Sequence, residues 1–377
     1  MKEFYKKVKS SDYCLSIFDG THDSPKYKSS GFPLVTSKCI VDTKIDASQA
    51  PLISKEDYDL VNKRSAVKQF DILISMIGVN AGIVGLIKEQ PKYAIKNVGV
   101  FRCKSELDAR YLFYYLQSAI GKYNLRSSMA GSAQPYISLE QLRTMLFYIP
   151  NDPLKQHIVN TIGSVDDLIE NYQQEVDKIC ELLDKSLLLY PNKVEISEYH
   201  PKLIKSGIES FADYKEYLDT SSVEGINNIS NGETISLNKR PSRANMQPIK
   251  NSVWFAKMKG SNKKLVITGN DNDLIERYIL STGFQGIIAT KELPLSLLTA
   301  FIISKNFDIQ RDLHSVGTTM AGINNETFMK MLVPQLNPSE VNDYDMKYSP
   351  FIKLLSERRK EISRLKSIKQ QLLQKYF

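Results

Sequence analysis

The stretch IVNTIGSVDDLIENYQQEVDKICELL (158–183) decides the fold, because its apolar residues return every three or four positions. These positions are Ile158, Ile162, Val165, Ile169, Tyr172, Val176, Ile179 and Leu183. Such spacing predicts a long helix with one apolar seam, the pattern of a coiled coil. Pro153 and Pro191 mark its limits. At ~1.5 Å rise per residue, a helix of roughly 35 residues is about 50 Å long.

A diverged copy of this region lies further along the chain, and matching residues differ in number by one constant offset. GSAQPYISLEQL (131–142) aligns with GTTMAGINNETF (317–328), and the same offset pairs Leu187 with Leu373 and Tyr190 with Tyr376. One offset held through a loop and a long helix indicates an internal duplication rather than a repeat array. The second seam has two polar members and reads Tyr344, Tyr348, Phe351, Leu355, Arg358, Ile362, Leu365, Lys369, Leu372 and Tyr376. Pro350 predicts a kink or a start early in this helix.

Each helix needs a partner for its apolar seam. We expect the two helices to pair with each other as a coiled coil. The alternative is that each helix packs on its own globular domain or on another protein.

The regions before the helices have the pattern of α/β domains. Residues 1 to about 150 contain candidate strands at 32–36, 71–77, 82–87, 99–104 and 145–150. Residues 108–122 have helical spacing, and Ser138 with Gln141 has the spacing of a capping box. The second region ends alike, with an expected helix at 295–304, a short helix from Asn324 and the strand MLVPQ (331–335). The interiors of the two regions differ, which suggests modules that read different things.

Charge and composition permit a polyanionic partner without requiring one. The formal net charge is +8, and residues 239–264 contain eight Lys or Arg and no acid, with Trp254 and Phe255 among them. The stretch MKEFYKKVKSSDYCLSIF (1–18) lacks the long apolar core of a signal peptide, and the most apolar run (293–303) is too short to cross a bilayer. We therefore expect a cytoplasmic protein with no membrane partner.

No motif for catalysis or metal binding stands out. The four histidines and four cysteines are scattered, without a CxxC pair, and the common metalloprotease, hydrolase and phosphate-loop motifs are missing. We expect no catalytic residue, no metal ligand and no enzyme activity in this chain.

The order of these segments resembles a known family. DGTH (19–22), GFPLVTSK (31–38), DILISMIGVNAGIVG (71–85), KNVGVFRC (96–103) and GSAQPYISLEQL, followed by the heptad helix, resemble the specificity subunits of type I restriction–modification systems. The resemblance implies an α/β (α+β) fold with a pseudo-two-fold internal duplication. Two target-recognition domains, 1–152 and 192–338, would alternate with two conserved helices, 153–191 and 339–377, that form an antiparallel coiled coil.

The same resemblance implies the partners. A specificity subunit is non-catalytic, reads half of a split double-stranded DNA site with each domain, and docks two modification (methyltransferase) subunits. Those subunits bind S-adenosylmethionine, whereas this chain would bind no cofactor, and they connect to restriction (translocase–nuclease) subunits. Leu168, Leu182 and Leu188 would help to dock the methyltransferases, unless they only widen the seam between the helices. The competing interpretation is a non-catalytic structural or adaptor protein with two protein-binding domains on a coiled-coil spacer.

The candidate DNA contacts fall into two sets, because phosphate contacts position a protein and base contacts give it specificity. The first-domain candidates are His22, Lys26, Tyr27, Lys38, Asn80, Gly131, Ser132, Gln134 and Tyr136. The second-domain candidates are Arg240, Arg243, Lys257, Lys259, Lys263, Gly317, Thr318, Thr319 and Met320. Gln134 has the chemistry for a bidentate contact with adenine, which its counterpart Met320 lacks. The sequence therefore predicts two different half-sites.

Overall fold

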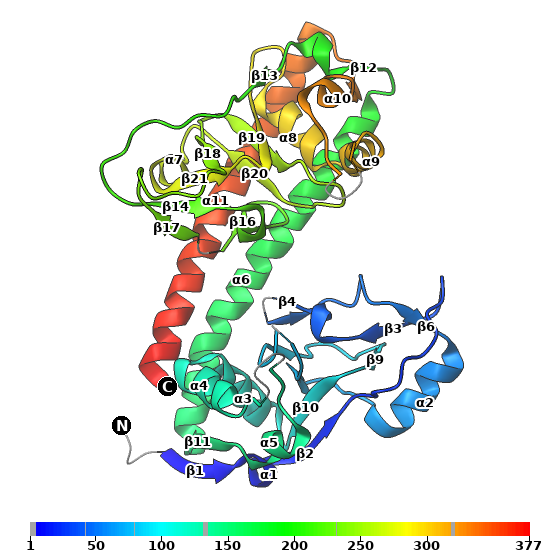
Figure 1. Cartoon of the computed structure of the whole chain (residues 1–377), viewed down its shortest axis with the longest axis vertical. Coiled ribbons are helices and arrows are strands. Elements are labelled where there is room, and N and C mark those ends of the chain that lie inside the picture. The colour runs from blue at the N-terminus through cyan, green and yellow to red at the C-terminus, as the bar shows by residue number, and fades with distance from the viewer. Residues whose placement is uncertain (1–4, 42, 79, 131–134, 231, 318–320) are drawn as a thin grey trace. The chain divides into compact units, whose positions relative to one another are not determined.

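The computed structural model describes residues 5–41, 43–78, 80–130, 135–230, 232–317 and 321–377. They divide into two compact units (Figure 1). Unit 1 comprises residues 1–168 and 365–377, and unit 2 comprises residues 169–364. Two long helices, α6 (Asp152–Ser186) and α11 (Pro338–Tyr376), contribute to both units.

Unit 1 is built on an antiparallel sheet with the strand order β2–β10–β7–β8. These strands are β2 (Cys14–Asp19), β10 (Val98–Cys103), β7 (Ile72–Ser75) and β8 (Val84–Leu86). A ribbon joins β1 (Tyr5–Lys9) to β11 (Leu146–Pro150). The smaller elements are α1 (Ser10–Tyr13), β3 (Phe32–Val35), η2 (Ser37–Cys39), β4 (Ile40–Val41), β5 (Lys44–Ile45), β6 (Leu52–Ile53), α2 (Lys55–Ser65), β9 (Ala94–Ile95), α3 (Glu106–Gln117), α4 (Ala119–Ser127) and α5 (Leu139–Thr144).

Unit 2 repeats this plan with the sheet β13–β22–β19–β20. These strands are β13 (Lys202–Leu203), β22 (Phe284–Ile288), β19 (Ser252–Ala256) and β20 (Lys264–Ile267), and the ribbon pairs β12 (Lys193–Glu195) with β23 (Leu332–Pro334). A second sheet has the order β17 (Glu233–Ile235), β14 (Lys215–Leu218), β21 (Tyr278–Ser281), β18 (Ala244–Met246). The remaining elements are η3 (Leu187–Leu189), η4 (Ile196–Tyr199), η5 (Thr220–Ser222), β15 (Val223–Glu224), β16 (Asn228–Ile229), α7 (Asn272–Arg277), α8 (Leu295–Ile303), α9 (Lys305–Leu313) and α10 (Asn325–Met329).

The duplication extends to the opening strand of each copy, where the sequence does not reveal it. Lys7 pairs with Tyr148 in unit 1, and Lys193 pairs with Pro334 in unit 2, at the same offset as Gly131 and Gly317. The next hydrogen bond also repeats, since the Ser10 N–H donates to Met145 O and the Ile196 N–H donates to Met331 O, both at 2.8 Å. The two copies therefore still correspond in backbone pairing at positions where their side chains no longer correspond.

The helix expected at 108–122 is broken into two. Ser118 ends α3 and caps α4, because its hydroxyl donates to Tyr115 O at 2.6 Å and accepts from the Gly121 N–H. Ser304 does the same between α8 and α9, bonding Phe301 O at 2.7 Å and the Phe307 N–H. A serine at an N-cap satisfies a backbone donor that the helix leaves open. The sharp turn between the helices is thus part of the duplicated frame.

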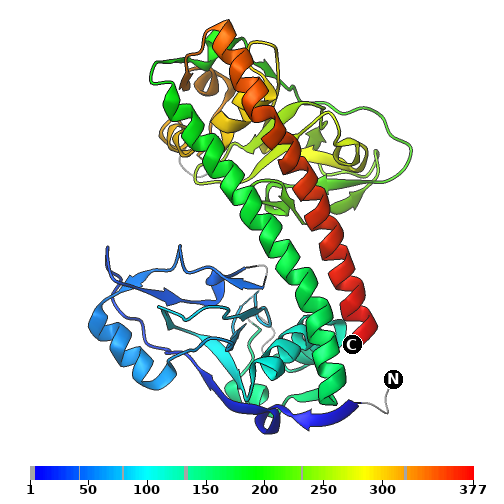
Figure 2. The same cartoon turned by 180° about the vertical axis from the view of Figure 1, so that it is seen from behind.

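The two long helices pair within each unit, as the seams predict, and run in opposite directions, as the resemblance implies (Figure 2). In unit 1, Lys369 Nζ lies 2.7 Å from Asp166 Oδ1 and the Tyr376 hydroxyl lies 3.0 Å from His157 Nε2. In unit 2, Arg358 Nε lies 2.5 Å from Glu175 Oε2. The two charged seam positions thus form ion pairs with the facing helix. Pro350 lies inside α11, which continues through it rather than beginning there.

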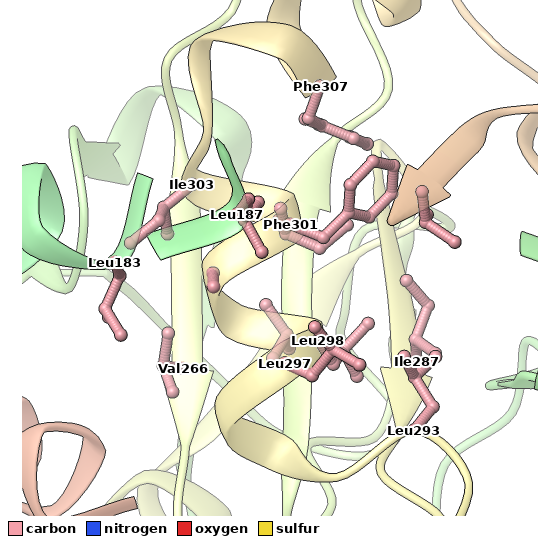
Figure 3. Close-up of a cluster of buried hydrophobic side chains, with 14 of the residues drawn as sticks. Leu183, Leu187, Val266, Ile287, Leu293, Leu297, Leu298, Phe301, Ile303 and Phe307 are labelled. Atoms are coloured by element: carbon pink, nitrogen blue, oxygen red, sulfur yellow. The ribbon is translucent and has the colours of Figure 1, made fainter. Parts of the chain in front are cut away.

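The core of unit 2 surrounds α8, whose sequence LSLLTAFII is apolar on all sides. Figure 3 shows Leu297, Leu298 and Phe301 of this helix facing buried residues of the sheet and of the α6 end. Trp254 and Phe255, which lie in the basic block, are fully buried on β19. Lys264 is also buried, and its ammonium group pairs with Asp308 at 2.9 Å. Part of the basic block therefore belongs to the core.

An ionic network centred on the buried Arg359 and Asp271 joins α11 to the N-terminal end of α7 in unit 2. Arg359 Nη2 lies 2.8 Å from Asp271 Oδ1, and Arg359 Nη1 lies 2.8 Å from Asp273 Oδ2. The Ser356 hydroxyl also donates to Asp271, at 2.6 Å. Burial alone would raise the pKa of Asp271, but the hydrogen bonds from Ser356, Thr268 and Arg359 lower it to about 2.

Among the described residues, no helix combines the length and the hydrophobicity needed to cross a membrane.

Candidate nucleic-acid interface

Two equivalent loops, 130–136 and 316–322, carry several of the candidate residues. Ala130 and Tyr136 exchange two backbone hydrogen bonds of 2.9 Å, and Val316 and Gly322 exchange bonds of 3.0 and 3.1 Å. Gly317 has φ +109°, a conformation that favours glycine over residues with a side chain. The candidates Gly131, Ser132, Gln134, Thr318, Thr319 and Met320 lie outside the described residues. The structure therefore defines the base of each loop.

Each loop base rests on the residues that follow a buried strand. In unit 1, the Ile137 N–H donates to Met76 O at 2.8 Å and the Gly78 N–H donates to Pro135 O at 2.9 Å. In unit 2, the equivalent bonds join the Ile323 N–H to Lys257 O at 3.1 Å and the Lys259 N–H to Ala321 O at 2.9 Å. We call Met76–Gly78 with 135–139 the first corner, and Lys257–Lys259 with 321–323 the second corner. Met76, Ile77 and Gly78 thus correspond to Lys257, Met258 and Lys259.

The first corner contains a cavity of about 390 Å³, which brings together two of the candidates, His22 and Tyr136. Its lining is Asp19, His22, Met76, Ile77, Asn97, Tyr136, Ile137, Ser138 and Leu139. The His22 ring is fixed at both nitrogens, with Nδ1 2.8 Å from Asn97 Oδ1 and Nε2 2.9 Å from Asp19 Oδ2. The cavity therefore has an apolar wall and a small polar rim, as ligand sites commonly do.

The second corner is cationic. Lys257 is half-buried, and burial together with the nearby Arg243 lowers its pKa. Gly283 adjoins both residues, since its carbonyl accepts from the Lys257 backbone N–H and a Cβ atom there would lie 3.0 Å from Arg243 Nη2. Among the described residues, neither side chain has a carboxylate partner. Lys259 is exposed beside them.

The other candidates are placed less closely together. Asn80 lies in the turn after Gly78, where its carbonyl accepts from the Ile83 N–H. Lys26, Tyr27 and Lys38 are exposed elsewhere on unit 1, and Lys263 is half-buried at the far end of the 257–263 turn. Arg240 is held by its own loop, because its guanidinium donates to Leu237 O at 2.6 Å and to Ala244 O at 3.1 Å. The structure thus gives Arg240 a local bonding role that the sequence did not predict.

Sequence reasoning missed Asp19 and Asn97, which hold His22, and the exposed apolar pair Ile77 and Met258. The only signal for the second pair is structural, because the chain between each corner residue and its loop differs in length in the two copies, so Ile77 and Met258 do not align at the offset that pairs Gly131 with Gly317. Within the described ranges, no three His, Cys, Asp or Glu side chains lie close enough to hold a metal ion.

Comparison with known proteins identifies what this arrangement resembles. Residues 21–180 match the family model described as the type I restriction modification DNA specificity domain. The type I restriction enzyme MjaVIII specificity subunit of Methanocaldococcus jannaschii is 30% identical over 149 residues, which are 37% of this chain and 35% of that protein. The chain therefore spans about a third of the length of this curated relative.

One solved structure extends the likeness of fold to the whole chain. The type I restriction–modification S subunit from M. genitalium aligns with a TM-score of 0.52 at 12% identity, over 99% of this chain and 96% of that one. The HsdS subunit from Thermoanaerobacter tengcongensis covers the same shares at a TM-score of 0.36 and 12% identity. At this identity the likeness to the M. genitalium subunit shows the fold alone, and it confirms the expected fold class.

Proposed function

We propose that this chain is a specificity subunit of a type I restriction–modification system and that it recognises a split, asymmetric DNA sequence with one half-site for each recognition domain. The match of residues 21–180 to the specificity-domain family and the likeness of fold support this proposal. DNA target recognition is the task of the family, and its specificity subunits are the non-catalytic members of these systems. We assign residues 1–152 and 192–338 to the recognition domains and residues 153–191 and 339–377 to the spacer helices.

The observation that carries the proposal is the pair of cations at the second corner. Lys257 and Arg243 lie near each other, and neither has a carboxylate partner within the part of the chain that the structure describes; the pKa of Lys257 is lowered by burial and by Arg243. A half-buried, uncompensated positive charge costs free energy unless an anion approaches it. A DNA phosphate is such an anion, and lysine is a common ligand for it.

The long helices fit the role of a spacer. At ~1.5 Å per residue, the 35 residues of α6 measure about 52 Å, which exceeds one turn of B-DNA at about 34–36 Å. We infer that helix length fixes the gap between half-sites, whereas the recognition domains choose the bases.

The remaining partners follow from this assignment. Leu168, Leu182 and Leu188 are exposed on α6 and η3, and we assign them to the docking of two methyltransferase subunits. Those subunits would supply S-adenosylmethionine and connect the chain to restriction subunits in the cytoplasm. No cofactor is assigned to this chain.

A selection experiment tests the proposal. The full chain, assembled with methyltransferase subunits of the same restriction–modification system, is mixed with random-sequence duplex DNA, and bound DNA is sequenced. We expect a split sequence with a constant gap. If no sequence is enriched, the DNA assignment fails and an adaptor protein with two protein-binding domains becomes the better interpretation.

The variant Lys257→Met then tests the phosphate contact. Loss of one contact should weaken binding to all sequences on the order of tenfold and lower the slope of log K against log salt by about 0.9. The matched control is Lys202→Met, which removes an exposed lysine from the edge strand β13. An unchanged salt slope for Lys257→Met removes this lysine from the interface.

A further inference from the structure

An apolar side chain is exposed at the same place in both corners. Ile77 is 38% exposed and Met258 is 51% exposed, although each closely follows a strand whose residues are all buried. The two residues correspond through the backbone bonds of the loops and differ in type. Exposed apolar residues are common singly, but equivalent ones in two diverged copies need a shared explanation.

The backbone on either side of each residue is fixed. Ile77 lies between the bonds that Met76 and Gly78 make to the first loop base, and Met258 lies between the bonds of Lys257 and Lys259 to the second. A bridge also pairs Ile77 with Tyr136, and another pairs Met258 with Gly322. The side chains are therefore presented from rigid positions, as a specific contact requires.

The surroundings of the Ile77 and Met258 side chains differ, so a contact made by one should differ in strength from a contact made by the other. Ile77 lies beside the 45%-exposed Tyr136 at the cavity of the first corner. Met258 has no aromatic neighbour at that position, because Gly322 is there. A Cβ atom on Gly322 would lie 2.9 Å from Lys257 O, so a larger residue does not fit without movement. Met258 is instead flanked in sequence by two lysines.

We propose that Ile77 and Met258 each contact the 5-methyl group of a thymine, one in each half-site. This inference rests on the proposed DNA-binding function. If the lysines beside Met258 bind DNA phosphates, they would direct the Met258 side chain into the DNA groove between the two phosphate backbones. Of the groups that base pairs display in the major groove, the thymine methyl is the apolar one. The Tyr136 ring adds a second wall, so the first half-site discriminates more strongly for its thymine than the second does.

The test replaces single thymines of the selected duplex by deoxyuridine, which removes only the methyl group. The probe is the sequence enriched from the random pool, bound by the full chain with its methyltransferase subunits. One replacement in the first half-site should weaken binding about fourfold, the equivalent of ~0.8 kcal/mol for one buried methyl group, and one replacement in the second half-site should weaken it less. Ile77→Ala should abolish the effect in the first half-site, and Met258→Ala should abolish it in the second.

The controls distinguish a failure of the thymine contacts from a failure of the proposed DNA recognition. Leu60→Ala removes a similarly exposed apolar residue from α2 and should leave both deoxyuridine effects in place. Ile77→Val serves as a second variant in case Ile77→Ala folds poorly. It should have an unchanged unfolding temperature and should keep a reduced deoxyuridine effect in the first half-site. If a split site is enriched but either half lacks thymine, or if deoxyuridine acts equally on wild type and variants, the thymine contacts are wrong while DNA recognition stands. If no site is enriched, both fail.

Discussion

The first and second corners share the same backbone hydrogen bonds, but their exposed side chains differ in chemistry. Both place a loop base on the residues after a buried strand with two hydrogen bonds. The first corner offers Met76, Ile77 and Gly78 beside an apolar cavity, whereas the second offers Lys257, Met258 and Lys259 beside Arg243. Hydrogen bonds between main-chain atoms tolerate any side chain, so the frame persisted while the exposed side chains diverged. A duplicated scaffold of this kind can present two different surfaces without a change of fold.

The two copies of the duplication also differ in how their long helices are bound to the globular parts. In unit 2, Arg359 of α11 is bound by Asp271, the N-cap of α7, and by Asp273 in the first turn of α7. The residue at the equivalent position of α6 is Gln173, which cannot form such ion pairs. The buried ionic joint is therefore a property of the second copy.

The largest expected effect comes from Asp271→Ala. It leaves Arg359 buried without its best partner, which should cost about 3–5 kcal/mol of the free energy of unfolding of unit 2. The matched change Gln173→Ala should cost less than about 0.5 kcal/mol. Urea unfolding followed by hydrogen exchange in α7 and β21 measures both. Equal effects of the two changes would contradict the asymmetry.

The ion pairs between Arg359 and the two aspartates also predict that the stability of unit 2 depends on pH. The pKa of Asp271 is lowered to about 2, below its usual value near 3.9. A carboxyl with a lowered pKa stabilises the folded state above its unfolded pKa and loses that contribution as the pH falls. Unit 2 of the wild type should therefore lose stability between about pH 4 and pH 2, and Asp271→Ala should lack this component.

A smaller effect is expected from Leu373→Ala and Leu187→Ala, which occupy equivalent positions at the helix ends. Leu373 is buried in the core of unit 1, and Leu187 is buried in the core of unit 2. Each truncation should cost about 2–4 kcal/mol, because it leaves a cavity. Hydrogen exchange should increase in α3 for Leu373→Ala and in α8 for Leu187→Ala. The reverse assignment would contradict the division into these two units.

The smallest effect is expected from Pro350→Ala. Proline inside a helix lacks one backbone donor and costs stability, whereas the equivalent residue of α6 is Ser164. Alanine should stabilise α11 by about 1 kcal/mol or more, and Ser164→Ala should change α6 by about 0.5 kcal/mol. Thermal unfolding of both variants measures the difference. A destabilising Pro350→Ala would show that the proline is needed for packing.

Much of the frame could be predicted because its signals are periodic. The heptad seam predicts α6 and its pairing, and Ser138 with Gln141 forms the capping box that its spacing predicts. The opening strand β12 could not be predicted, since its three residues carry no pattern and gain their place only by pairing with β23. Local sequence does not encode such long-range pairing.

The candidate site was harder to predict for a related reason. Charge alone groups Lys264 with Lys257, yet one is buried on an ion pair with Asp308 and the other lacks a carboxylate partner among the described residues. Trp254 lies in the same basic block and is part of the core. Which cations are free depends on the carboxylates that the fold brings near them, and those come from distant segments.

The contribution of residues 365–377 to unit 1 has a consequence for the order of synthesis. Leu373 completes the buried core of unit 1, the Phe377 ring packs on Tyr111 and Tyr115, and the Tyr5 hydroxyl donates to Tyr376 O. A ribosome makes these residues about 200 positions after residue 168, on the order of 10–40 s later at ~5–20 residues per second. Unit 1 therefore emerges first but finishes folding last, and an interrupted chain leaves it with exposed apolar surface that quality-control proteases can attack.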